Sequence, residues 1–292
     1  HKLNWENILQ YKKSFRVETI CRKSKIYHSG AASQRISKAI SDKIDAKEDP
    51  NSRIIIKTRI SSDICTISLD SSGEGLHKRG YKIESGKAPI RETLAALFLE
   101  KMEFDGSQVI YDPMCGSGTI VIEAAEIALG LPAGRNRTFA FMELPSFKKK
   151  KYQELTEVHQ KKIDLKFYGS DRDESAVLNS IKNSKNAGVE TFCHFTKTSI
   201  SNVTPPTQKP GIILVNPPYG KRIGDRKKLF ALHRSLGRTL TEKFIGWQVG
   251  IITSDAGLAK ATGLNFLDIS SAVDNGGIKV KLYKTKINNP KS

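Results

Sequence analysis

Apolar and polar positions divide this chain into two parts that predict different folds. From residue 108 onward, short apolar runs alternate with segments whose apolar residues recur every three to four positions. This alternation is typical of strands followed by helices, and it predicts an α/β fold with a doubly wound, mainly parallel sheet. The predicted strands cover 109–111, 167–170, 191–196, 212–215, 248–253 and 278–283, and the predicted helices cover 119–129, 174–186 and 229–244.

The residues before about position 80 predict a smaller α+β unit. Apolar residues at helical spacing predict a helix over 31–44, and extended apolar segments predict strands on either side of it. The predicted strands cover 14–19, 53–60 and 64–69, and a hairpin-like link joins the last two.

Two connecting segments complete the predicted organisation. Pro89 suits a first helical position, so a helix over 90–102 is predicted as a bridge between the two parts. An irregular insertion is predicted over 131–165, and its four consecutive lysines, 148–151, are more typical of a solvated face than of a binding patch. The predicted domains are a front domain over 1–86, a linker helix over 87–104 and a second domain over 105–292.

A glycine-rich loop, 112–119 (DPMCGSGT), follows the strand at 109–111 and leads into a helix. Such a junction directs backbone N–H groups and the positive end of the helix toward a ligand. A P-loop would need a lysine directly after Gly118, and a dinucleotide fingerprint would need a third glycine where Val121 stands. Both nucleotide-binding readings therefore fit poorly.

An amino-acid moiety fits this loop better. Asp112 ends the strand and can accept hydrogen bonds from a ligand ammonium, while the glycines bring the ligand carboxylate near the start of the helix. S-adenosylmethionine carries such a moiety, so it is the predicted cofactor. The predicted cofactor-binding residues of the loop are Asp112, Met114, Cys115, Gly116, Ser117, Gly118 and Thr119.

Two acidic residues follow the next predicted strand. Asp171 ends that strand, where a carboxylate can accept two hydrogen bonds from a ribose diol. Asp173 precedes a helix, and aspartate is a preferred N-cap residue. We therefore assign Asp171 to the ligand and Asp173 to the helix cap.

The apolar run 212–215 ends in the tetrapeptide Asn216-Pro217-Pro218-Tyr219. The two prolines cannot continue a sheet ladder, so the backbone forms a stiff turn at the carboxyl end of a buried strand. Open α/β sheets bind ligands at such ends. An amide oxygen beside a flat ring suits the exocyclic amine of a planar base, with the ring stacked on its face.

Bulk composition favours a polyanionic partner. The 48 Lys and Arg residues outnumber the 30 Asp and Glu residues, which gives a formal net charge of +18. Lysine and arginine in excess strengthen nucleic-acid binding by releasing counterions.

The four cysteines, Cys21, Cys65, Cys115 and Cys193, are too far apart for a metal cluster, so no metal is expected and a reducing cytoplasm fits. The chain starts at His1 and not at a methionine, so we expect a fragment of a longer protein.

These motifs together resemble the THUMP-domain RNA methyltransferases. The most similar family is the bacterial one that methylates guanine N2 in 23S ribosomal RNA, and the resemblance covers nearly the whole chain. It is carried by the segments 73–81 (GEGLHKRGY), 88–96 (APIRETLAA), 112–119, 168–171 (YGSD), 216–220 (NPPYG) and 275–277 (NGG).

The resemblance implies a Rossmann-like methyltransferase domain with a seven-stranded sheet whose last strand is antiparallel. It also implies that the front domain is most of a THUMP RNA-binding module without its preceding ferredoxin-like portion. The family usually has an acid after the third strand, near the cofactor adenine, and this chain offers Thr198 or Ser199 there. Thr198 is the predicted contact.

The resemblance further implies direct methyl transfer from S-adenosylmethionine to guanine N2, with Asn216, Pro217 and Tyr219 as the catalytic residues. The expected partner is 23S ribosomal RNA, as a protein-poor precursor, in the cytoplasm. Three alternatives stay open: a transfer-RNA guanine-N2 methyltransferase, an adenine-N6 methyltransferase, and a non-catalytic RNA-binding factor. The predicted phosphate contacts are His77, Lys78, Arg79, Lys221 and Arg222.

Overall fold

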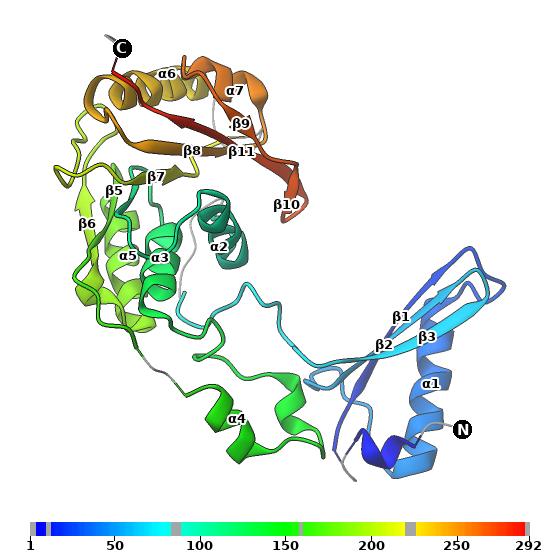
Figure 1. The fold of residues 1–292 in the computed structure, drawn as a ribbon. Coiled ribbons are helices and arrows are strands. Elements are labelled where there is room, and N and C mark those ends of the chain that lie inside the picture. The colour runs from blue at the N-terminus through cyan, green and yellow to red at the C-terminus, as the bar shows by residue number, and fades with distance from the viewer. Residues whose placement is uncertain (1–3, 10–12, 83–88, 158–159, 220–225, 290–292) are drawn as a thin grey trace. The chain divides into compact units, whose positions relative to one another are not determined.

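The computed structural model describes residues 4–9, 13–82, 89–157, 160–219 and 226–289 (Figure 1). The chain forms two compact units. The front unit consists of residues 1–76 and 137–157, and the sheet unit consists of residues 77–136 and 158–292.

The front unit is built on a three-stranded sheet with the order β1-β2-β3. Strands β1 and β2 are parallel, and β3 returns antiparallel through the predicted hairpin. Helix α1 contributes Ile40 and Ile44 to a core that also contains Phe15 and Ile56. The elements are η1 (Trp5–Asn7), β1 (Arg16–Arg22), α1 (Ser29–Ile44), β2 (Ile55–Ser61), β3 (Ile64–Asp70), η2 (Ala140–Glu143) and α4 (Lys149–Leu155).

The sheet unit contains eight strands in the part of the chain that is described, in the order β10-β11-β8-β7-β4-β5-β6, with β9 paired to β11. The predicted count of seven was therefore too low. Strand β11 is antiparallel to β8, as expected for the last strand, whereas β4, β5, β6, β7 and β8 are parallel to one another. The strands are β4 (Ile110–Asp112), β5 (Phe167–Asp171), β6 (Cys193–Lys197), β7 (Ile212–Val215), β8 (Gln248–Thr253), β9 (Asp268–Ile269), β10 (Val273–Asn275) and β11 (Ile278–Lys286).

Helices pack on this sheet as the alternating pattern predicts. Helix α3 is buried at every position except Ile127, so it lies inside the unit, and its buried Glu123 and Glu126 pair with arginines. Asp173 caps α5 by accepting a hydrogen bond from the Ser175 N–H, which confirms its predicted role. The helices are α2 (Glu92–Lys101), α3 (Thr119–Leu129), α5 (Glu174–Ala187), η3 (Glu190–Phe192), α6 (Arg226–Lys243) and α7 (Ala256–Ala261).

The predicted boundaries differ from this division at two places. Helix α2, predicted as a linker, belongs to the sheet unit, where Phe98 and Leu99 are fully buried in its core. The insertion is not irregular throughout, because it holds η2 and the lysine-bearing α4, and only 137–157 belongs to the front unit.

The start of α2 also corrects a prediction. Pro89 is not the first helical residue, since the backbone stays extended through Arg91, which is the N-cap. The extended stretch lets Ile90 turn into the core. No helix among the described residues has the length and apolar content needed to cross a membrane.

Candidate active site

A cavity of about 330 Å³ lies at the carboxyl ends of β4, β5 and β7. Strand β4 pairs with β5 on one side and β7 on the other, so the chain order of the sheet reverses at this point. Ligands of open α/β sheets bind at such a reversal. The cavity is lined from both sides, by Asp112 and Gly116 after β4 and by Asn216 and Tyr219 after β7.

The glycine-rich loop approaches the cavity because two of its residues adopt left-handed backbone conformations. Gly116 has a φ of 53° and Gly118 a φ of 81°, a region that glycine adopts without a steric penalty. A side chain at Gly118 would also meet Phe195 and Ser180 at 3.0 Å. The Gly116 N–H donates to Asp171 Oδ2 over 3.0 Å, which ties the loop to the end of β5.

Asp112 is the buried carboxylate of the site. Its Oδ1 accepts a hydrogen bond from the Met114 N–H over 3.0 Å. Burial is the main cause that raises its pKa to about 8, and the nearby charge of Asp171 adds to the effect. A cation in the cavity would favour the charged form of Asp112, so the site fits a ligand that carries an ammonium group.

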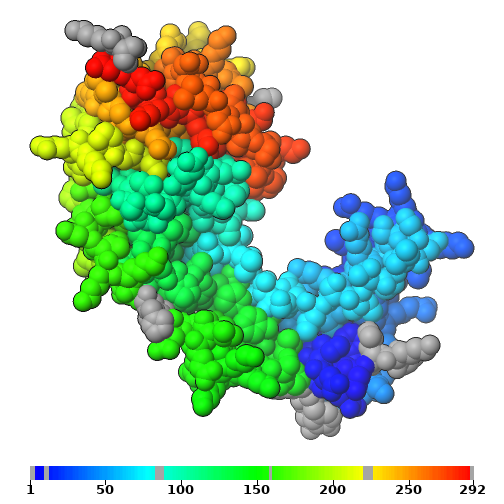
Figure 2. Space-filling model, in the orientation of Figure 1, coloured from blue at the N-terminus to red at the C-terminus, as the bar shows by residue number. Residues whose placement is uncertain are grey.

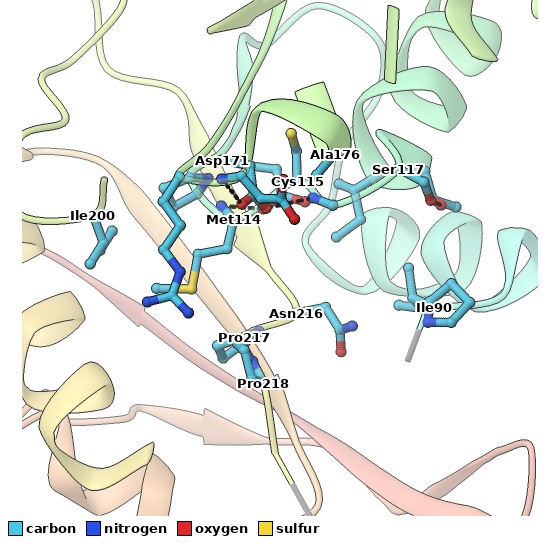
Figure 3. Close-up of a pocket in the computed structure, with 18 of the residues that line it drawn as sticks. Ile90, Met114, Cys115, Ser117, Asp171, Ala176, Ile200, Asn216, Pro217 and Pro218 are labelled. Carbon is cyan, nitrogen blue, oxygen red and sulfur yellow. Dashed lines mark hydrogen bonds between the residues drawn. The ribbon is translucent and has the colours of Figure 1, made fainter. Parts of the chain in front are cut away.

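Cys115 is directed away from the cavity centre. Its Sγ lies 3.8 Å from Ser180 Oγ, and Figure 3 shows the sulfur on the side opposite Asn216. Burial raises the pKa of this thiol well above its usual range, which disfavours the thiolate that a nucleophile requires. A packing role agrees with these observations.

Asn216 lies across the cavity from the glycine-rich loop. Figure 3 shows its side chain in the space between Met114, Ser117 and Ile90. Its Oδ1 is fully buried and has no hydrogen-bond partner among the residues that the structure describes. A buried amide oxygen without a hydrogen-bond donor destabilises the fold by roughly 1–3 kcal/mol. A hydrogen-bond donor on a molecule bound in the cavity would satisfy this oxygen.

Tyr219 forms a second wall near Asn216. The side chain is buried, with 6% of the residue surface exposed, and its hydroxyl accepts a hydrogen bond from Asn275 Nδ2 over 3.2 Å. Burial raises the pKa of this phenol, so it is neutral near pH 7.

The structure brings most of the predicted cofactor residues to one cavity, but not all of them. Asp112, Met114, Cys115, Gly116, Ser117, Thr119 and Asp171 line it. Gly118 lies just outside the lining, as does Thr198, whose N–H donates to the Asp171 carbonyl oxygen over 2.9 Å. Ile200, from the same loop as Thr198, is the residue that reaches the cavity (Figure 3).

The predicted phosphate contacts are divided by the structure. Arg79 is enclosed, since its Nη2 lies 3.2 Å from Glu123 Oε2 and both side chains are largely buried. We therefore revise its assignment from phosphate binding to neutralising Glu123. His77 is half-buried and Lys78 is exposed. Lys221 and Arg222 lie outside the described residues.

Sequence reasoning missed the apolar lining of the cavity. Pro89 and Ile90 come from the segment before α2, Ile200 from the loop after β6, and Leu232 from α6. The segment 88–96 carried part of the family resemblance, and that signal could have placed Pro89 and Ile90 at the site. Ile200 and Leu232 gave no such signal, because apolar residues that line a cavity follow the same pattern as core residues.

Comparisons with known proteins agree with this architecture. The family described as RMKL-like, methyltransferase domain, matches residues 79–283. The protein named ribosomal RNA large subunit methyltransferase K/L of Vibrio campbellii is 34% identical over 270 residues, which cover 86% of this chain and 38% of that protein. This chain therefore spans about two fifths of the length of that relative.

Solved structures align over almost the entire chain. The crystal structure of SMU.472 complexed with SAH aligns with a TM-score of 0.82 at 26% identity, over 99% of this chain and 78% of that one. The crystal structure of a possible methylase from Clostridium difficile 630 aligns with a TM-score of 0.85 at 29% identity, with the same coverage of 99% and 78%.

Proposed function

This chain belongs to the family of RMKL-like methyltransferase domains and uses S-adenosylmethionine as its cofactor, and from this premise we propose that it methylates the N2 amine of a guanine in 23S ribosomal RNA. The observation that carries the proposal is the unpartnered Oδ1 of Asn216 in the cavity that Asp112 shares. The name of the Vibrio relative supports a ribosomal RNA substrate.

The residues after β4 and β5 hold the cofactor in this proposal. Asp112 accepts hydrogen bonds from the ammonium of the cofactor, and the loop at Gly116 lies against its carboxylate. Asp171 accepts from the ribose hydroxyls, and Ile200 packs near the adenine where the family usually has an acid. When bound, S-adenosylmethionine supplies a methyl group activated by its sulfonium.

The residues after β7 hold the target amine. Asn216 Oδ1 and the Pro217 carbonyl oxygen each accept an N–H hydrogen from the amine, which turns the nitrogen lone pair toward the methyl group. Tyr219 supports the face of the base. The amine is a weak nucleophile because its lone pair is delocalised into the ring, so alignment supplies much of the rate. Well-oriented reactants gain on the order of 7–11 kcal/mol.

The RNA must present an unstacked guanine to reach this cavity. Unstacking costs a few kcal/mol, so a single-stranded or opened site in a protein-poor precursor of the ribosome is the proposed substrate.

The proposed phosphate contacts are His77, Lys78, Lys221 and Arg222. The front unit is proposed to be a partial THUMP module, and the cytoplasm is the proposed location.

Substitution of Asn216 tests the proposed catalytic role. The variant Asn216→Ala removes the amine acceptor but leaves the glycine-rich loop intact, so methyl transfer should fall by more than about a hundredfold. Cofactor affinity measured by calorimetry should stay within about threefold of the unsubstituted protein. The matched control is Asn202→Ala, an exposed amide in the loop after β6, which should retain full transfer. Full transfer by Asn216→Ala would overturn the assignment.

Mass spectrometry of nucleosides distinguishes the remaining candidates. RNA from cells with and without the gene should differ in N2-methylguanosine of 23S ribosomal RNA. Loss of N2-methylguanosine from transfer RNA would favour the transfer-RNA enzyme, and loss of N6-methyladenosine would favour the adenine enzyme. No difference in any methylated nucleoside would favour the non-catalytic RNA-binding factor.

A further inference from the structure

The hairpin of β10 and β11, at the edge of the sheet, contacts Tyr219 of the cavity lining. Asn275 pairs with Ile278, and Gly276 and Gly277 form the turn with φ values of 65° and 89°. Asp274 Oδ1 accepts a hydrogen bond from the Gly277 N–H over 3.1 Å, which closes this turn. The hairpin is therefore a defined element that can hold a side chain in place.

The hairpin lies beside α2 at the N-cap of that helix and contacts its last turn. A side-chain carbon at Gly276 would lie 3.5 Å from the guanidinium of Arg91, the N-cap of α2. Farther along β11, Lys284 Nζ donates to the Lys101 carbonyl oxygen over 3.1 Å. Figure 2 shows the orange-to-red atoms of these last strands beside the teal atoms that include α2. Ile90, next to Arg91, lines the cavity.

Asn275 connects this hairpin to the cavity wall. Its Nδ2 donates to the Tyr219 hydroxyl over 3.2 Å, and the contact is partly shielded from water. Tyr219 follows two prolines, which restrict the backbone, and its ring is buried with the core of the sheet unit. The hydrogen bond to Asn275 holds the hydroxyl at the tip of this buried ring.

We propose that Asn275 is a positioning residue for methyl transfer, which fixes the Tyr219 ring at the wall that supports the target base. This inference rests on the proposed function, because it assigns Tyr219 to the base. It adds a residue from the far end of the chain to the site and gives the last hairpin a role in catalysis. Loss of the hydrogen bond frees the tip of the ring, so fewer bound bases are aligned for transfer.

A double-mutant cycle between Asn275 and Tyr219 tests the inference. The variant Asn275→Leu keeps the side-chain size and removes the donor, and Tyr219→Phe keeps the ring and removes the acceptor. Each should lower kcat by about tenfold, as expected for one lost hydrogen bond, with an unchanged KM for S-adenosylmethionine. The double variant should be no slower than the slower single variant, because both remove the same contact. Lys279→Gln, at an exposed position of the same hairpin, should keep the original kcat.

Three results would overturn the inference. The first is an unchanged kcat for Asn275→Leu, and the second is a double variant whose loss equals the product of the two single losses. Tyr219→Phe leaves the hairpin itself intact, so the third result, an unchanged kcat for this variant, would overturn the inference even if Asn275→Leu fails to fold. The cycle can be measured on whichever nucleobase is methylated, so a target other than guanine N2 would contradict the proposed function and leave this inference standing.

Discussion

At the scale of single residues, Asp112 controls how the protonation of the site responds to the cofactor. Burial holds its pKa at about 8, so the free protein keeps this carboxyl protonated at neutral pH. A ligand ammonium stabilises the charged form and lowers that pKa. If Asp112 binds the cofactor ammonium as proposed, cofactor binding near neutral pH releases the proton of Asp112.

Calorimetry measures this proton directly. At pH 6.5, the binding enthalpy of S-adenosylmethionine should depend on the ionisation enthalpy of the buffer, with about one proton released per cofactor. Affinity should rise from pH 6 toward pH 7.5, because the charged carboxylate then becomes easier to form. Asp112→Asn should bind more weakly and release no proton. Identical enthalpies in all buffers would contradict the assignment of Asp112 to the ammonium.

At the scale of elements, the sequence predicted best where apolar runs were unbroken. Helix α3 and strands β7 and β8 have the predicted bounds, since their apolar residues continue to a glycine, a proline or a polar cluster. Strands β9 and β10 were missed because they have two and three residues that are exposed or half-buried, so no apolar pattern marks them. The polar residues of the site could be predicted because carboxylates and amides at the ends of apolar strands are easy to recognise. Most of its apolar residues could not, because they follow the same pattern as core residues.

The segment before α2 is held to the sheet unit by ion pairs that the sequence did not reveal. Arg79 pairs with Glu123 of α3, and Lys82 lies 3.2 Å from Glu92 at the start of α2. Burial raises the pKa of Glu123 to about 7 even with Arg79 beside it. The sequence predicts His77, Lys78 and Arg79 as phosphate contacts, and it does not distinguish Arg79, the buried cation beside Glu123, from its neighbours in the basic cluster.

Removal of Arg79 should destabilise the fold in a pH-dependent manner. Arg79→Met leaves the buried Glu123 carboxylate without its cation, which should lower the free energy of unfolding by roughly 2–4 kcal/mol at pH 8. The loss should be smaller at pH 5, because Glu123 is then protonated and no longer needs a cation. Urea unfolding at both pH values measures the difference.

An exposed lysine of α5 provides the control for the change in net charge. Lys182→Met removes the same charge from the surface and should leave stability within about 0.5 kcal/mol at both pH values. An equal loss for Arg79→Met at pH 5 and pH 8 would contradict the ionic role of the pair.

At the scale of the whole molecule, the net charge of +18 sets the response of RNA binding to salt. If about six phosphates of a single-stranded segment are contacted, the logarithm of the binding constant should fall with a slope of roughly −4 against the logarithm of salt concentration. Fluorescence anisotropy with a 23S RNA fragment between 50 and 200 mM salt measures this slope. Cofactor affinity should change far less over the same range, and a flat RNA response would argue against a phosphate-dominated interface.

The division of the chain determines how the protein can be dissected. The polypeptide crosses between its two units after residues 76, 136 and 157. Leu144 packs against the core of the front unit, and Arg137 donates to the Gly75 carbonyl oxygen within it. An expression clone that starts at residue 77 would still encode 137–157, stripped of these neighbours. Expressing the sheet unit alone therefore requires deleting 137–157 and joining residue 136 to residue 158. Truncation at the N-terminus alone would leave this segment of the front unit inside the sheet unit.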